Sequence, residues 1–124
     1  MKIEAVDCDL FFIPLPRVMS DSTHGQIEFF SHVTVRIRDR DGAVGTGYTY
    51  TVGKTGGPAL LALLKHDVVP RLLGEDPREI DRVWQKLWWA LHYVGRGGLA
   101  SFAISAVDIA LWDLRARRAD QPLW

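Results

Sequence analysis

The amino-acid sequence predicts an α+β fold, a three-stranded antiparallel meander followed by a helical bundle. Two observations support it. β-Branched and aromatic residues in rough alternation dominate the first part of the chain, and leucines and tryptophans at helical spacing dominate the second. Strands that come before helices, rather than alternating with them, are typical of α+β domains. A length of 124 residues allows one domain and not two.

The three strands are predicted from hydrophobic alternation and turn signals. We expect the first strand to end at Pro14 and Pro16, because proline donates no hydrogen bond to a sheet. Asp41-Gly42 is a strong hairpin signal. Gly45 and Gly47 indicate that another element packs closely against the last strand. The predicted strands cover residues 2–13, 31–38 and 43–51.

Two segments lack a clear period, and we expect them to be loops. Residues 14–30 form a long connection rich in loop-forming side chains, and residues 52–57 form a short glycine-rich one. Long ordered loops in compact domains are often functional. Each follows a strand, so both can meet at one edge of the sheet. Ordinary solvated loops are an equally weighted alternative.

Three helices are expected after the strands. The first begins at Pro58 and ends between Pro70 and Gly74. The second has Asp76 as its cap and Pro77 as its first residue. The last, residues 101–118, is apolar on almost every side, so we expect it to be buried all round. This domain alone can hardly cover it, which suggests a partner or a longer polypeptide.

Composition excludes several classes of protein. Fifteen basic residues balance fifteen acidic ones, which argues against binding nucleic acid or an anionic membrane surface. The single Cys8 excludes an intrachain disulfide, and the longest apolar run, Ala59–Leu64, is too short to span a membrane. We therefore expect a cytoplasmic protein.

Chemical motifs are scarce. The four histidines have no metal-binding spacing, and no nucleophile elbow or phosphate-binding glycine pattern occurs. Residues 95–98 are better explained as a tight turn than as an anion site. Asp108 and Asp113 on the last helix are either acid/base groups or, with more support, partners of a loop or an arginine.

Several motifs together resemble a known family. They are Gly74-Glu75-Asp76-Pro77 before a tryptophan-rich helix, Gly95-Arg96-Gly97-Gly98 before Asp108-Ile109-Ala110-Leu111-Trp112-Asp113, and then Asp120-Gln121-Pro122-Leu123. The whole chain resembles the N-terminal capping domain of the enolase superfamily, in its mandelate racemase/muconate lactonizing enzyme branch. Within that branch it looks most similar to acid-sugar dehydratases of the galactarate and talarate type.

The resemblance implies that binding and catalysis are divided between two domains. The capping domain closes over a TIM-type barrel, which supplies the bases and the carboxylates that hold Mg²⁺. We therefore expect residues 1–124 to be a domain cut before its own C-terminal barrel, with no catalytic and no metal-binding residue. The partners implied are that barrel, a small carboxylate or acid-sugar substrate and further copies of the chain, octamers being frequent.

The resemblance also places substrate-binding residues in the two loops. Asp21, Ser22 and Thr23 fall where relatives contact the distal part of the substrate, and His24 follows them. The second loop contributes Tyr50, Val52 and Lys54. Relatives tend to place basic residues at the positions of Val52 and Gly53, so this sequence departs from the pattern that recognises a distal carboxylate.

Two hypotheses for function follow. The first is the substrate-selecting lid of a Mg²⁺-dependent enzyme that removes the proton α to a carboxylate, with acid-sugar dehydratase ranked before racemase. The second is a standalone α+β interaction module without catalysis, which docks through its apolar last helix.

Overall fold

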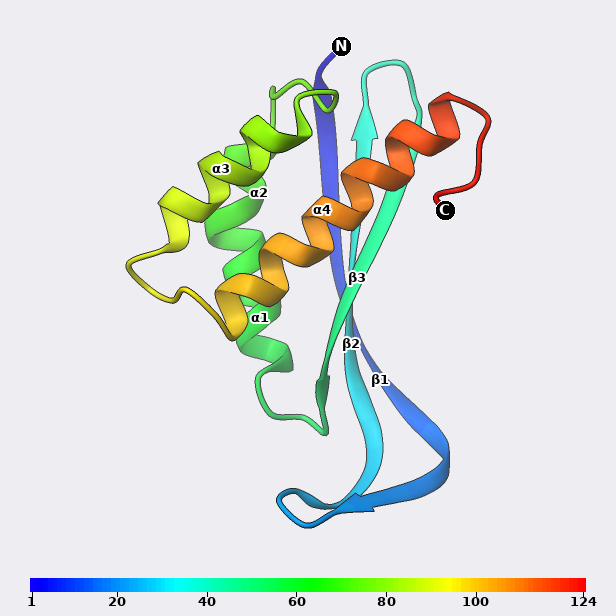
Figure 1. Ribbon diagram of the computed structural model, residues 1–124, viewed down its shortest axis with the longest axis vertical. Coiled ribbons are helices and arrows are strands. Elements are labelled where there is room, and N and C mark those ends of the chain that lie inside the picture. The colour runs from blue at the N-terminus through cyan, green and yellow to red at the C-terminus, as the bar shows by residue number, and fades with distance from the viewer.

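The computed structural model describes all residues 1–124 and contains one three-stranded antiparallel sheet. The strands are β1 (Ile3–Asp21), β2 (Gly25–Asp39) and β3 (Val44–Val52), in the order β1-β2-β3 (Figure 1). The predicted meander and its Asp41-Gly42 turn are confirmed. No helix is both long and apolar enough to cross a membrane.

The predicted loop 14–30 is wrong, because most of it is β-structure. β1 and β2 continue as a two-stranded ribbon, closed by a turn at residues 22–24, and we call residues 14–29 the arm (Figure 1). The register runs from Pro14 opposite Phe29 to Met19 opposite Ile27, with an irregularity between. Pro14 and Pro16 do not end the strand, because β1 is an edge strand and its bulge tolerates residues without an N–H group.

The first predicted helix is confirmed as a continuous rod with an unpredicted π-helical turn. It comprises α1 (Gly57–Leu63), the π-turn η1 (Leu64–Val68) and α2 (Val69–Leu72). The rod ends at Leu72, between Pro70 and Gly74 as predicted, and Pro70 lies in its last turn. A wider turn in front of a proline accommodates its missing N–H group.

The remaining helices are α3 (Ile80–Leu91) and α4 (Leu99–Arg118). Residues 95–98 belong to the connection between them, as expected. α3 begins three residues later than predicted, since Asp76 does not act as its cap. The Asp76 carboxylate instead accepts hydrogen bonds from the Arg78 amide at 2.9 Å and from its guanidinium at 2.6 Å.

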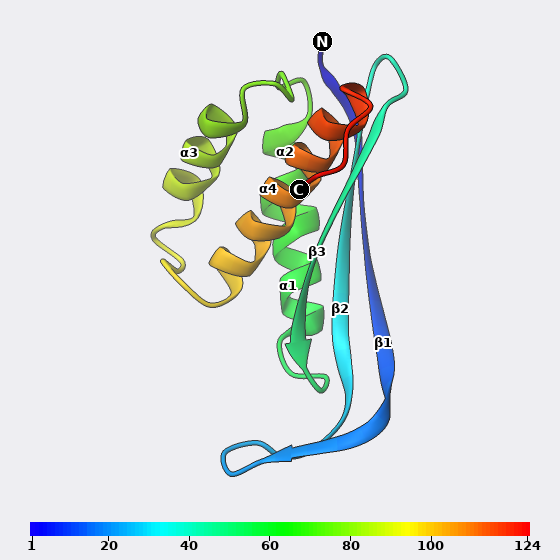
Figure 2. The same cartoon turned by 45° about the vertical axis from the view of Figure 1, so that its right-hand side comes forward.

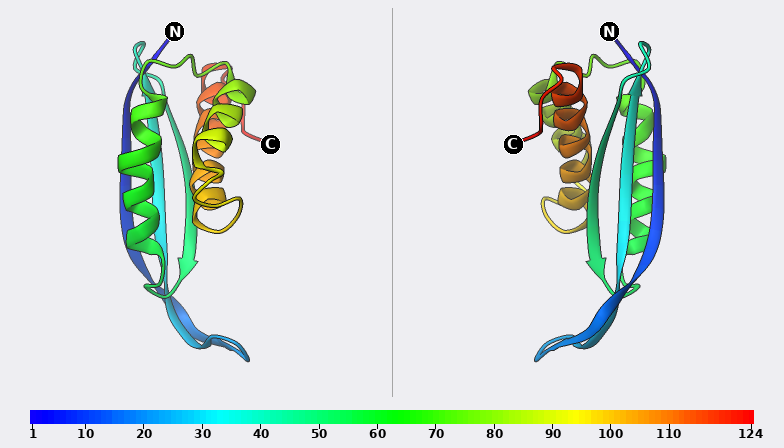
Figure 3. Two further views of the ribbon diagram at one scale, coloured as in Figure 1. Left: turned by 90° about the vertical axis from the view of Figure 1, so that its left-hand side faces the viewer. Right: turned by 90° about the vertical axis from the view of Figure 1, so that its right-hand side faces the viewer.

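The helices all lie on one face of the sheet. α1 lies over β1 and β2, α4 lies over β3, and α3 packs on the far side of α4 (Figures 2 and 3). Val33, Val35 and Ile37 on β2 meet this layer and are fully buried. Asp39 closes the end near the N-terminus, because its buried carboxylate accepts hydrogen bonds from the Ala43 amide and from Arg118 Nε at 2.7 Å.

Two glycines bring α4 into direct contact with the backbone of β3. A Cβ atom on Gly47 would lie 2.0 Å from the Ala106 carbonyl oxygen and 2.6 Å from the Ala110 nitrogen. One on Gly45 would lie 2.1 Å from the Ala110 oxygen. The close packing predicted from these glycines is confirmed.

The rest of the domain covers one part of α4 and leaves another part exposed, so the expectation that the domain alone can hardly cover this helix is confirmed in part. Its apolar side chains are shared between β3 on one side and α3 on the other, which together bury Ala106, Val107, Leu111 and others. Phe102 and Trp112 remain 41% exposed. At the chain end, Trp124 is 99% exposed.

We predict that Gly47→Ala destabilises the fold strongly. Because the added methyl group would meet helix backbone and not a flexible side chain, α4 must move, at a cost of about 3 kcal/mol. Urea denaturation measures the loss. Gly97→Ala is the matched control, since a Cβ there meets nothing within 4 Å, and a similar loss in both variants would contradict the assignment.

We also predict that Cys8 is unreactive in the folded protein. Burial raises the pKa of its thiol to about 11, despite the opposing charge of Lys65. Thiolate is the reactive species, so a thiol reagent at pH 8 should label Cys8 only after denaturation. Rapid labelling of the native chain would contradict this burial.

Candidate functional site

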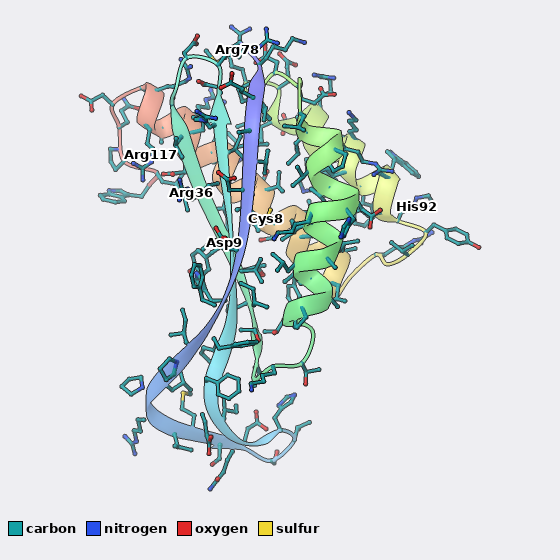
Figure 4. The ribbon with its side chains drawn as sticks, turned by 180° about the vertical axis from the view of Figure 1, so that it is seen from behind. Cys8, Asp9, Arg36, Arg78, His92 and Arg117 are labelled. Atoms are coloured by element: carbon teal, nitrogen blue, oxygen red, sulfur yellow. The ribbon has the colours of Figure 1, made fainter.

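The arm and the loop after β3 lie at the same end of the molecule, whereas both termini lie toward the opposite end (Figure 1). The two segments predicted to carry function are therefore neighbours. Other residues with reactive side chains lie elsewhere. Figure 4 places Cys8 in the middle of the sheet and His92 in the turn after α3, both outside the arm.

The tip of the arm is organised by Asp21. Its Oδ1 atom accepts hydrogen bonds from the backbone amides of Thr23, at 2.9 Å, and His24. Its Oδ2 atom lies 2.8 Å from His24 Nδ1. The next residue, Gly25, has a φ of 69°, which most side chains disfavour. The turn thus fixes the His24 ring beside the Asp21 carboxylate.

These hydrogen bonds also change the acidity of Asp21. The His24 amide and ring, followed by the Thr23 amide, lower the pKa of the carboxyl group below its ordinary value, against a smaller opposing effect of burial. Asp21 is therefore ionised over the whole physiological range and presents negative charge at the tip.

The loop after β3 is attached to β2. Ser31 Oγ donates a hydrogen bond of 2.5 Å to the Gly53 carbonyl oxygen, and the Gly53 amide donates one of 3.0 Å to the Phe29 oxygen. The Ser31 side chain also abuts Gly57, where an added Cβ would lie 2.7 Å from it. Both ends of the loop are therefore held against one point of β2.

A groove of about 370 Å³ joins the arm to this loop. It brings together His24 and Val52, two of the residues predicted from the sequence. Its other polar side chains were missed, because the arm was expected to be a loop without a defined face. The groove is lined by His24, Gln26, Ile27, Glu28, Phe29, Val52, Gly53 and Thr55.

The other predicted residues lie outside the groove. Asp21, Ser22 and Thr23 form the tip beside it. Tyr50 packs against Phe30, with ring centroids 5.1 Å apart, and does not line the groove. The ammonium group of Lys54 lies over two phenylalanine rings, 5.5 Å from the centroid of Phe12 and 5.6 Å from that of Phe29.

The two acidic residues of α4 occupy different environments. Asp113 accepts hydrogen bonds of 2.8 Å from the Thr46 amide and from Arg117 Nε, which confirms the expected arginine partner. Asp108 lies at the junction of α3 and α4. Burial raises the pKa of Asp108, and the charge of Asp81 adds to this effect.

Possible metal ligands do not cluster in this chain. No three histidine, cysteine, aspartate or glutamate side chains lie close enough together to coordinate a metal ion.

The family model for the N-terminal domain of mandelate racemase and muconate lactonizing enzyme matches residues 5–124. The chain belongs to this family. A relative named 3,6-anhydro-α-L-galactonate cycloisomerase, from Streptomyces coelicolor, is 56% identical over 98% of the chain and 34% of its own length. The L-talarate/galactarate dehydratase of Salmonella typhimurium is 42% identical over 98% of the chain and 31% of its own length.

Solved structures agree with this assignment. A racemase from Streptomyces coelicolor with bound magnesium superposes with a TM-score of 0.91 at 56% identity, over 94% of the chain and 32% of the racemase. The L-talarate/galactarate dehydratase from Salmonella typhimurium, liganded with magnesium and L-lyxarohydroxamate, superposes with a TM-score of 0.89 at 41% identity, over 98% of the chain and 32% of the dehydratase. The chain thus spans about a third of the relatives it matches.

The arm tip should lose its order in acid. Because the folded state lowers the pKa of Asp21, its stabilising contribution is complete above the ordinary pKa of 3.8 and is lost as pH falls through the lower folded value. In NMR titrations, the Asp21 carboxyl carbon and the Thr23 amide should titrate together, with a midpoint below pH 3.8. A midpoint above pH 3.8 for these two signals would contradict the hydrogen bonds at the tip.

Proposed function

We propose that residues 1–124 are the substrate-selecting lid of a Mg²⁺-dependent enzyme that removes the proton α to the carboxylate of a sugar acid. The observation on which the proposal depends is the groove between the arm and the loop after β3. The match to relatives whose names include a cycloisomerase and a dehydratase supports it. In this proposal the metal ligands and the bases lie after residue 124, which agrees with the lack of clustered ligand side chains in this chain.

We propose further that the substrate carries one carboxylate and not two. The residues that line the groove include one acid, Glu28, and no lysine or arginine. Asp21 adds a second negative charge at the tip. A distal carboxylate would therefore meet like charge, whereas sugar hydroxyls would meet donors and acceptors on His24, Gln26 and Thr55.

The part of the mechanism that this chain performs is binding and enclosure. When bound, magnesium polarises the substrate carboxylate and stabilises the charge that develops as the α-proton leaves. His24 and Gln26 orient the hydroxyl groups, and Ile27, Phe29 and Val52 displace water from the closed site. Exclusion of water strengthens every electrostatic interaction beneath the lid.

The test is to separate selection from chemistry in the full-length protein. We expect His24→Ala to lower kcat/KM for the preferred sugar acid about tenfold, the equivalent of one good hydrogen bond. α-Proton exchange on a small carboxylic acid that does not reach the lid should be largely unchanged. Asp21→Ala, which releases the His24 ring, should act in the same direction.

His66→Ala is the control, because His66 is exposed on η1, away from the arm. It should leave both reactions unaltered. An equal loss in His24→Ala on the sugar acid and on the small acid would overturn the proposed role of the lid.

A further inference from the structure

The helices stop covering the sheet at the root of the arm. The first residue of α1, Gly57, lies over Ser31 and Leu10. Ser31 is paired with Phe12. The next pair along the same face of the ribbon is Phe29 with Pro14. Phe12 is 48% exposed. A two-stranded ribbon without a covering layer is only marginally stable, so the arm needs another source of order.

Lys54 supplies a cover for these two rings. Its ammonium group lies 5.5 Å from one centroid and 5.6 Å from the other, within the range in which a cation is attracted to a ring. The two rings meet edge to face, with centroids 6.0 Å apart and planes at 74°. Lys54 forms no ion pair, since no carboxylate oxygen lies within 4.0 Å of it.

The backbone next to Lys54 is held at the same place. Gly53, the preceding residue, bonds to Ser31 and to Phe29 on β2. From this fixed point, the Lys54 side chain reaches both β2, through Phe29, and β1, through Phe12. Just beyond, the β1–β2 register becomes irregular between Pro14 and Met19. The contact therefore sits where the direction of the arm is set.

We propose that Lys54 is a positioning residue, which holds the arm at its working angle by bridging Phe12 and Phe29, and is not a ligand of the substrate. The width of the groove depends on this angle, because the arm contributes His24 and Gln26 to its lining and the loop after β3 contributes Thr55. The link from Lys54 to substrate selection rests on the proposed function. The proposal that Lys54 controls the angle of the arm does not depend on the proposed function.

The experiment compares four variants of the full-length protein. Lys54→Met keeps most of the stem and removes the charge, Lys54→Arg keeps a cation, and Phe12→Leu removes one ring. Lys65→Met is the control, an exposed lysine on η1 that also has no ion pair. Two quantities are measured, which are amide hydrogen exchange in residues 19–27 and the KM and kcat for the sugar acid.

For a positioning role, Lys54→Met should accelerate arm exchange about fivefold, the size expected for a cation over two rings at a partly exposed site. KM should rise by a similar factor with kcat nearly constant. Phe12→Leu should reproduce both effects although the lysine is intact. Lys54→Arg should keep arm exchange and KM near their wild-type values, because it retains a cation. Lys65→Met should change neither quantity.

A substrate ligand would behave differently. Lys54→Met would then raise KM while arm exchange stays at the wild-type rate, and Phe12→Leu would leave KM unchanged. Either result overturns the proposal. If the wild-type protein has no activity on sugar acids, the proposed function fails, and the exchange measurement alone still decides whether Lys54 positions the arm.

Discussion

The contact between α4 and the backbone of β3 determines the arrangement of everything else in this domain. At Gly45 and Gly47 the helix packs directly against the strand with no side chain between them. The residues of α4 in contact there, Ala106 and Ala110, also have small side chains. Helix and strand therefore approach more closely than ordinary side chains allow. α3 can then cover the outer side of α4, while the rod of α1, η1 and α2 covers β1 and β2.

The same arrangement leaves the arm outside the packed layers. The helices cover only the half of the sheet nearest the termini, where buried Asp39 also ties the β2–β3 turn to Arg118 at the end of α4 (Figure 1). Beyond Ser31 the ribbon has no hydrophobic layer over it, and local contacts order it instead. This arrangement suits a lid, because the packed helices and sheet keep their shape while the arm, which lacks a covering layer, contacts the ligand.

Sequence patterns predicted the packed part of the domain better than the arm. The glycines of β3 and the periodic spacing of apolar residues in α3 both reflect close packing and could be recognised in the sequence. Pro14 and Pro16 were expected to end β1, but edge position and register irregularity, which decide whether a strand tolerates proline, are properties of the assembled sheet. The start of α3 shifted for a local reason, since Arg78, two residues further along, binds the Asp76 carboxylate.

The candidate site was predicted only in part. Polar residues at the tip could be identified from composition and from the family resemblance, and the structure does bring His24 and Val52 to one groove. Phe12, Phe29 and Ser31 could not be identified, because their importance comes from pairing between distant segments. Lys54 was predicted as a substrate-binding residue from its position along the chain. Its place over two phenylalanine rings, on which the proposed positioning role depends, could not be predicted in that way.

The most direct test of the central claim is a crystal structure of the full-length protein with magnesium and a sugar acid bound. We predict that the distal hydroxyl groups of the ligand lie against His24 and Gln26, in the groove between the arm and Gly53, and that the metal is held entirely by residues after 124. A ligand remote from the arm, or an arm that points into solvent while the ligand is bound, would contradict it.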